Sequence, residues 1–171
     1  MPRPNFARAL SLTLALAAGL SLGACARGNT DAADGLAAGA GAGAAAGAPG
    51  SLQDFTANVG DRVFFDSDSS ELSAAAQATL EKQAGWLGKY PTYSFTIEGH
   101  ADERGTREYN FALGARRAEA AKTYLVAKGV AATRMKTISY GKERPVAVCD
   151  DISCWSQNRR AVTVLAGAAG S

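Results

Sequence analysis

Strand and helix patterns alternate along residues 55–166 of this 171-residue chain, which predicts an α/β sandwich with helices on one face of a small sheet. Two segments carry apolar residues at helical spacing, and short runs around them alternate apolar and polar residues as strands do. The stretch before residue 55 consists mainly of Ala and Gly and shows neither pattern. The chain is therefore predicted to be one folded domain behind a tether, and these patterns leave parallel or antiparallel strand pairing open.

The first expected elements are a strand and a helix. The apolar run Val63-Phe64-Phe65 predicts a short strand, closed by the polar turn at 66–70. A helix is predicted to begin near Ser73 and to stop before Pro91, because proline cannot continue a helix. The residues expected to face the core from this helix are Ala76, Leu80, Ala84 and Leu87.

The second half repeats this order and adds two strands. Residues 93–98 alternate apolar and polar side chains, which predicts a strand covered on one face. A second helix is predicted over 109–128 with Gly129 as its C-terminal cap, followed by strands over 137–140 and 161–165. Its expected core residues are Leu113, Ala121, Tyr124 and Leu125.

Residues 1–24 have the pattern of an export signal. Arg3 and Arg8 give a basic start, an apolar run follows over 9–22, and small residues come next. This run is too short for a stable helix across a bilayer core of ~30 Å, which needs roughly 20 residues. We therefore expect residues 1–24 to be cleaved.

The charge balance argues against a nucleic-acid partner. The whole chain has 18 basic and 16 acidic side chains, and loss of Arg3 and Arg8 with the signal leaves 16 of each. A neutral mature chain lacks the basic excess that phosphates require. The single histidine also makes a His-rich metal centre implausible.

Residues 25–54 are predicted to be a flexible tether. Ala and Gly dominate this segment, so few side chains are large enough to offset the entropy of ordering it. Glycines cost a helix about 1 kcal/mol each, and a coil of this length spans ~30 Å. The segment is therefore expected to separate Cys25 from the folded domain, assigned to residues 55–171.

One polar stretch, GHADERGTREYN over 99–110, lies between a predicted strand and helix. Asp102 follows the strand end, and Asn110 and Arg117 lie seven positions apart, on one helix face with Leu113 between them. An arginine can donate two parallel hydrogen bonds to a carboxylate, and an aspartate accepts hydrogen bonds from an ammonium. These side chains together therefore suit a zwitterionic ligand. From the residues alone, an internal Asp102–Arg117 salt bridge is the simpler interpretation.

His100 raises the question of an enzyme. Nucleophilic catalysis needs a positioned nucleophile beside the histidine, and no such motif is present in the sequence. We predict no catalytic residue and a structural imidazole bonded to local backbone. Cys149 and Cys154, with four residues between them, are predicted to form a disulfide in an exported protein; the alternative is a metal clip with His100.

The stretch GHADERGTREYNFALGARRAEAAKTYL resembles the OmpA-like peptidoglycan-binding domain family, and within it the peptidoglycan-associated lipoproteins of the Tol–Pal system. The later runs YGKERP over 140–145 and NRRA over 158–161 favour this branch over barrel-linked or flagellar-motor relatives. The resemblance implies an OmpA-like fold with a small mixed sheet. Residues that meet the family pattern are Gly99, His100, Asp102, Gly105, Asn110, Leu113, Arg117 and Ala118.

Leu22-Gly23-Ala24-Cys25 resembles the lipobox of bacterial lipoproteins. In that family the cysteine thiol carries diacylglycerol and its new amino group is acylated, so two attachments hold the protein to the membrane. Apart from this lipid, the resemblance implies no cofactor and no metal. The alternative is a plain secretory cut after Ala24, which leaves Cys25 as an unpaired thiol in an oxidising compartment.

The resemblance also implies how the site works. Arg117 would fork the carboxylate of the free end of diaminopimelate, Asp102 would hold its ammonium, and backbone amides of the Phe65-Asp66 turn would contact the same group. Asn110 and Leu113 would line the pocket, with a helix cap as the alternative role for Asn110. A second basic edge is implied at Asn158 and at Arg159 or Arg160.

On this resemblance the chain is expected to be an outer-membrane lipoprotein that binds peptidoglycan noncovalently and works with TolB and other Tol proteins in envelope integrity and cell division. Ala26 after the lipidated cysteine fits outer-membrane sorting. The alternatives are a wall-processing peptidase or amidase, and an OmpA-like lipoprotein outside the Tol system. Asp102→Ala or Arg117→Ala is expected to abolish binding to cell-wall sacculi and to leave thermal unfolding near that of the wild type.

Overall fold

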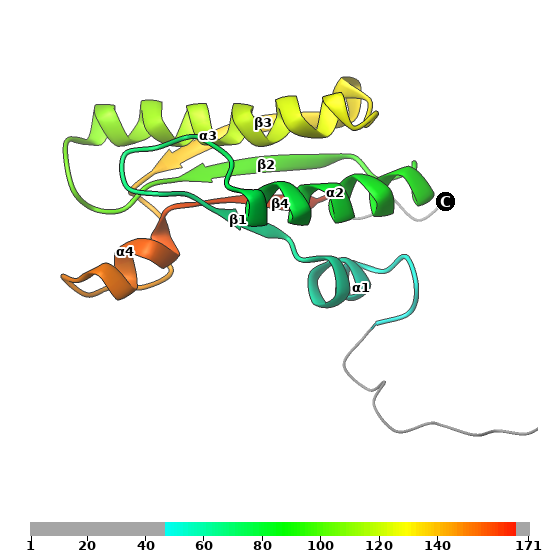
Figure 1. Ribbon diagram of the computed structural model, residues 1–171, viewed down its shortest axis with the longest axis horizontal. Helices are drawn as coiled ribbons and strands as arrows, with labels where there is room; N and C mark the ends of the chain where they lie inside the picture. Colours follow the sequence, from blue (N-terminus) through cyan, green and yellow to red (C-terminus); the bar gives the residue numbers. More distant parts are fainter. Residues whose placement is uncertain (1–46, 167–171) are drawn as a thin grey trace, which may run out of the picture. The chain divides into compact units, whose positions relative to one another are not determined.

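The computed structural model describes residues 47–166, so the predicted signal peptide, Cys25 and the tether up to residue 46 lie outside the described residues. Figure 1 shows how its elements are arranged. In chain order they are α1 (Leu52–Asp54), a π-helical turn (Phe55–Val59), β1 (Arg62–Phe64), α2 (Ala74–Lys89), β2 (Phe95–His100), α3 (Arg107–Ala127), a 3₁₀ turn (Ala132–Arg134), β3 (Met135–Gly141), α4 (Ile152–Asn158) and β4 (Arg160–Leu165).

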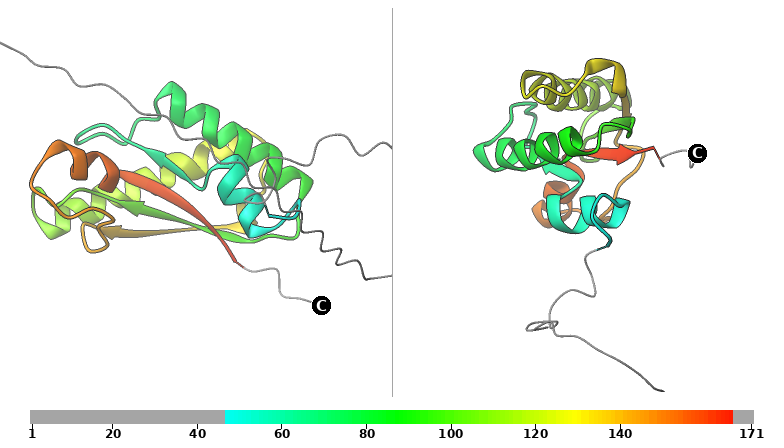
Figure 2. Two further views of the ribbon diagram at one scale, coloured as in Figure 1. Left: turned by 90° about the horizontal axis from the view of Figure 1, so that it is seen from below. Right: turned by 90° about the vertical axis from the view of Figure 1, so that its right-hand side faces the viewer.

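The four strands form one mixed sheet in the order β1-β4-β2-β3. Strand β4 is antiparallel to both of its neighbours, and β2 is parallel to β3. Helices α2 and α3 lie on the same face of the sheet, where α3 covers β2 and β3 and α2 covers β1 (Figure 2). The predicted α/β sandwich with helices on one face is therefore confirmed, and the mixed pairing settles what the patterns left open.

Both long helices begin at a side-chain cap. The Ser73 hydroxyl accepts from the amide of Ala76 at the start of α2, as predicted. Helix α3 begins two residues earlier than predicted, because the Thr106 hydroxyl accepts from the amide of Tyr109. Asn110 therefore lies inside α3, and its alternative role as a helix cap is wrong. The residue after the α3 C-cap, Gly129, has φ +92°, a conformation that suits glycine.

The core lies between this helical layer and the sheet. The predicted helix residues Leu80, Leu87 and Leu125 are fully buried, whereas Ala84 and Tyr124 are only partly buried. Gln83 is a buried polar residue that the apolar pattern misses; its amide nitrogen donates to the Gly60 carbonyl at 2.7 Å and its oxygen accepts from Thr163 at 2.9 Å. It thereby ties α2 to β4 and to the turn before β1.

The folded part begins before the predicted boundary at residue 55. The Tyr93 hydroxyl donates to the Gly50 carbonyl at 2.7 Å, and the Trp86 indole donates to the Asp54 carboxylate at 2.8 Å. The hydrogen bond from Trp86 is the main cause that lowers the pKa of Asp54. A boundary drawn from composition does not detect these contacts, because the partners are more than thirty residues away along the chain.

Helix α3 approaches β2 without intervening side chains at one point. A Cβ atom added to Gly99 would lie 1.8 Å from the backbone oxygen of Gly114 on α3. Two glycines facing each other allow this contact, and the contact fixes the distance between α3 and the sheet. The start of α3 and the end of β2 thus lie together at one end of the sheet, where α4 also packs (Figure 1).

Helix α4 lies in the connection between β3 and β4, where no helix was predicted. The Asn158 side chain accepts from the amides of Val146 and Ala147 and donates to the carbonyl of Ala147, which holds this connection in place. Cys149 and Cys154 form a disulfide with their Cα atoms 5.7 Å apart, so neither sulfur is free for a metal. Among residues 47–166, no helix combines the length and apolar character needed to span a bilayer.

Candidate functional site

A polar pocket of about 270 Å³ lies at the end of the sheet where β2 stops. The turn after β1, the loop after β2 and the first turns of α3 supply its walls. Of the predicted site residues, Asp102, Asn110 and Leu113 line it, whereas Arg117, Phe65 and Asp66 do not. The complete lining is Ser67, Asp68, Asp102, Arg104, Gly105, Tyr109, Asn110 and Leu113.

Asp102 is the buried carboxylate of this pocket, only 6% exposed, whereas Asp68 on its other wall is exposed. Its Oδ1 accepts from the amide of Arg104 at 3.2 Å and from Arg104 Nε at 3.3 Å. Its Oδ2 accepts from Arg104 Nη2 at 2.7 Å and from Arg159 Nη1 at 3.4 Å. Burial alone would raise the pKa of Asp102, but the hydrogen bonds from Arg104 and Arg159 outweigh burial and lower it. Asp102 is therefore a charged acceptor at neutral pH.

Arg117 lies behind the pocket wall and is 0% exposed. Its guanidinium donates to three backbone carbonyls: Nε to that of Ser69 at 2.8 Å, Nη1 to that of His100 at 2.8 Å and Nη2 to that of Asp66 at 3.0 Å. Burial lowers the pKa of Arg117 to about 10, with Asp102 acting in the opposite direction. Within residues 47–166 no carboxylate lies at ion-pair distance from this guanidinium. The prediction of an Asp102–Arg117 salt bridge is therefore wrong. Asp102 pairs with Arg104 and Arg159 instead.

The three carbonyl contacts give Arg117 a structural role. They join the turn after β1 to the end of β2, and the guanidinium also lies 5.2 Å from the centre of the Phe65 ring. Removal of the side chain would leave three carbonyls without their donor, which costs stability. The expectation that Arg117→Ala unfolds like the wild type is therefore inconsistent with the structure.

At the Phe65-Asp66 turn, the Phe65 amide does not have the role that the resemblance implies. The Phe65 amide donates to the Arg159 carbonyl at 3.0 Å, and the Phe65 carbonyl accepts from Arg159 Nε at 3.0 Å. The Phe65 amide is thus used inside the fold and is not available to a ligand. Phe65 and Asp66 instead line a neighbouring pocket of about 390 Å³, together with Arg159 and residues of α4.

Of the residues implied to form a second basic edge (Asn158 and Arg159 or Arg160), only Arg159 lies at the site. Arg159 contacts Asp102, whereas Arg160 donates to the carbonyls of Asn158 and Arg144 and does not reach the pocket. Asn158 also lies away from the pocket, where it holds the connection before α4. Asn110 has a local role, since its Nδ2 donates to the Arg104 carbonyl at 2.6 Å and fixes the loop that carries Asp102.

Arg104 and Trp155 are site residues that the sequence analysis missed. The guanidinium of Arg104 donates to the Ser67 hydroxyl at 2.8 Å and lies 4.2 Å above the Trp155 ring. The Trp155 indole in turn donates to Glu103. Arg104 belongs to the recognised stretch, but Trp155 follows no periodic pattern, so only the three-dimensional structure brings the two together.

His100 does not bond to local backbone as predicted. The side chain is 2% exposed, and neither ring nitrogen has a hydrogen-bond partner within the described part of the chain. Burial lowers the pKa of His100 to about 4, and the nearby Arg160 and Arg144 add to this shift. The Glu98 carboxylate lies 3.8 Å from Nε2.

This burial predicts a loss of stability in mild acid. Because the pKa of His100 falls from 6.5 to about 4 on folding, the unfolded chain binds the extra proton between these values. The contribution of His100 to the free energy of unfolding is then fully present above pH 6.5. It falls as the pH drops, by about 2 kcal/mol between pH 7.5 and pH 5. Urea unfolding at the two pH values measures this difference, and His100→Leu should remove most of it. An equal loss in this variant would contradict the assignment.

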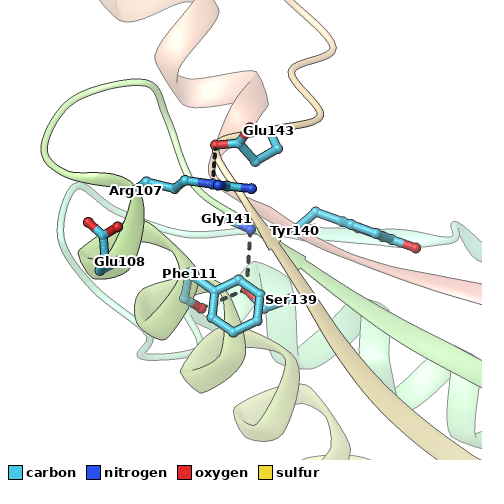
Figure 3. A pocket seen from close by; sticks show the side chains of 7 residues that line it. All are labelled: Arg107, Glu108, Phe111, Ser139, Tyr140, Gly141 and Glu143. Carbon is cyan, nitrogen blue, oxygen red and sulfur yellow. Dashed lines mark hydrogen bonds and ion pairs between the residues drawn. The ribbon is translucent and has the colours of Figure 1, made fainter.

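A larger pocket of about 510 Å³ lies beside α3, between its first turns and the end of β3. Figure 3 shows Arg107 paired with Glu143, with the Phe111 ring next to Ser139 below them in this view; the ion pair measures 3.3 Å. Beneath them the Ser139 hydroxyl donates to the Phe111 carbonyl at 2.6 Å. The predicted site residues are not among its lining, so its size does not make it the better candidate.

Comparison with known proteins decides the family. The model of the OmpA family matches residues 64–159, more than half of the chain, which include α2, β2, α3, β3, α4 and the residues that line the pocket. The chain belongs to the OmpA family. The resemblance to peptidoglycan-associated lipoproteins is confirmed as well, because relatives of that name are similar over most of the chain.

Two such relatives of this OmpA-family chain come from rhizobia. A peptidoglycan-associated lipoprotein of Rhizobium meliloti (strain 1021) is 76% identical over 120 residues, covering 70% of this chain and 68% of the relative. One from Mesorhizobium japonicum (strain LMG 29417 / CECT 9101 / MAFF 303099) is 65% identical over 157 residues and covers 91% of each chain.

Solved structures agree on the fold. The peptidoglycan-associated lipoprotein from Burkholderia pseudomallei aligns with a TM-score of 0.61 and 44% identity, over 62% of this chain and 90% of that chain. The C-terminal domain of Helicobacter pylori MotB aligns with a TM-score of 0.60 and 22% identity, over 64% and 86%, and shows the OmpA-family fold alone.

Proposed function

We propose that this chain binds peptidoglycan noncovalently by holding the free amino-acid end of diaminopimelate in the Asp102 pocket. One observation carries the proposal: a single recessed carboxylate is surrounded by guanidinium groups. Arg104 and Arg159 contact Asp102, and the charge of Arg117 acts on it from behind. Such a set offers an acceptor for an ammonium and a positive field for the carboxylate beside it.

The ligand's ammonium is assigned to Asp102, with Asp68 on the opposite wall of the pocket. Arg117 contributes its charge and holds the turn that carries Ser67 and Asp68, through its bonds to the carbonyls of Asp66 and Ser69. The ligand's carboxylate is assigned to the positive field of Arg104, Arg159 and Arg117, because the fully buried Arg117 side chain does not itself line the pocket. Binding through charged hydrogen bonds without a covalent link is reversible, which suits a removable tether.

The membrane end of the tether is assigned to lipid on Cys25, which places the protein at the periplasmic face of the outer membrane. The Ala- and Gly-rich segment then spans from that membrane to the wall. The relatives named peptidoglycan-associated lipoprotein support this arrangement. We further propose that the chain works with TolB and other Tol proteins, in envelope integrity and in outer-membrane constriction during division.

Replacement of Asp102 by asparagine tests the wall-binding site. The change keeps the shape of the side chain and removes its charge. The affinity for purified sacculi, measured from the sedimented fraction over a range of sacculus concentrations, should fall at least about tenfold, which corresponds to the loss of one charge-assisted hydrogen bond. Asp150→Asn makes the same chemical change at an exposed position and should sediment like the wild type. Equal sedimentation of both variants, with equal thermal unfolding, would refute the pocket assignment.

Two further measurements separate this proposal from its alternatives. A wall-processing enzyme would release muropeptides from sacculi, and we expect none, because no positioned nucleophile accompanies His100 in the structure described here. An OmpA-like lipoprotein outside the Tol system would share the pocket but would not retain TolB in a pull-down. Retention of TolB is therefore the expected result.

A further inference from the structure

The carboxylate of Asp102 has no free acceptor capacity in the structure. Two oxygens of a carboxylate offer about four acceptor positions. Two donors from Arg104 occupy Oδ1, and one donor each from Arg104 and Arg159 occupies Oδ2. An ammonium therefore binds Asp102 only if one of these donors leaves.

Arg104 is the donor that can leave. Its side chain is 44% exposed, whereas that of Arg159 is 8% exposed and is held by the Phe65 carbonyl at 3.0 Å. The Arg104 guanidinium also has other partners at the pocket, the Ser67 hydroxyl and the Trp155 ring. A small movement that breaks its bonds to Asp102 thus leaves the guanidinium beside the pocket and does not release it into bulk water.

We propose that Arg104 is a displaceable internal counter-ion that makes the pocket selective for zwitterionic ends over plain amines. This inference rests on the proposed function and adds the basis of its specificity. An incoming ammonium replaces the Arg104 guanidinium on Asp102. The freed guanidinium then pairs with a carboxylate, provided that the ligand carries one next to its ammonium.

The chemistry of the two common wall types makes this selectivity measurable. Diaminopimelate ends in an ammonium and a carboxylate on one carbon, so both charges released by the exchange are paired again. A lysine side chain ends in an ammonium alone. It would displace Arg104 and leave an unpaired guanidinium next to a second cation, which is unfavourable at this short distance. The wild type should therefore prefer the diaminopimelate end.

Two stem tripeptides that differ only in their third residue, meso-diaminopimelate or lysine, provide the test. Their affinities for the full-length chain in detergent micelles are measured by calorimetry. The wild type should bind the diaminopimelate peptide at least about tenfold more tightly, the value of one charge-assisted hydrogen bond. In Arg104→Ala this ratio should fall towards one, because the diaminopimelate peptide loses a partner and the lysine peptide meets a free Asp102.

Arg107→Ala is the matched control. Arg107 lies three positions along the chain and pairs with Glu143, so this variant removes one positive charge without touching Asp102. Its affinity ratio should equal that of the wild type. A ratio that is unchanged in Arg104→Ala, or that falls equally in both variants, overturns the counter-ion role. A merely structural role of Arg104 would weaken both peptides alike and would leave the ratio as it is.

Asp102→Asn separates failure of this inference from failure of the proposed function. If the wild type binds the diaminopimelate peptide and Asp102→Asn does not, the pocket assignment stands, and the ratio in Arg104→Ala alone decides the role of Arg104. If Asp102→Asn binds this peptide as well as the wild type does, the proposed pocket is wrong, and the counter-ion role falls with it.

Discussion

Replacement of Gly99 by alanine is expected to destabilise the folded domain by at least about 3 kcal/mol, the upper range for overpacking in a core. The new methyl carbon would lie 1.8 Å from the backbone oxygen of Gly114 and 2.6 Å from its carbonyl carbon. Backbone on both sides prevents a simple rotamer change, so α3 must move away from β2. The shift would also displace Arg117, which is anchored to the carbonyl next to Gly99.

Thermal unfolding checks this expectation, and the melting temperature should fall by more than about 10 °C. Gly88→Ala is the matched control, because an added Cβ atom there has no neighbour within 4 Å. This variant should gain up to about 1 kcal/mol, since Gly88 lies in α2 and alanine favours helix. If Gly99→Ala melts at the wild-type temperature, the direct contact between α3 and β2 does not exist.

The periodic elements are predictable because their signal is local. The apolar spacing of α2 and α3 and the alternation in β2 lie within single segments, so their positions agree with the structure to within a few residues. Strand pairing depends on which distant segments meet, and the patterns do not contain this information. Helix α4 is short and is held by the Asn158 side chain and a disulfide, so it has no apolar period that would reveal it.

The site was predictable only in part, for a related reason. Asp102, Asn110 and Leu113 come from one continuous stretch, and the structure places all three in one pocket. Helical spacing also places Arg117 on the same face, but it does not say that the turn after β1 covers that face. Trp155 and Arg159 contact Arg104 and Asp102 from the connection before β4, and of these two only Arg159 belongs to a recognised run, NRRA over 158–161.

Arg117→Met is expected to impair wall binding and folding together. Methionine retains much of the apolar stem and removes the guanidinium, so the carbonyls of Asp66, Ser69 and His100 lose their donor. The loss should be about 3 kcal/mol, because hydrogen bonds from charged groups contribute more than neutral ones. Urea unfolding measures this change, and sedimentation with sacculi measures binding, which should be abolished.

The neighbouring Arg116 supplies the control, because it is exposed on α3 and Arg116→Met removes the same charge. This variant should unfold and sediment like the wild type. Asp102→Asn is expected to behave differently again, with a strong loss of wall binding and a smaller loss of stability. The Arg104 side chain is 44% exposed and can be hydrated when the carboxylate is absent, and Arg159 keeps its bond to the Phe65 carbonyl. If Arg117→Met is as stable as the wild type and loses only binding, the three carbonyl bonds do not hold the turn. Arg117 would then act through its charge on the ligand alone.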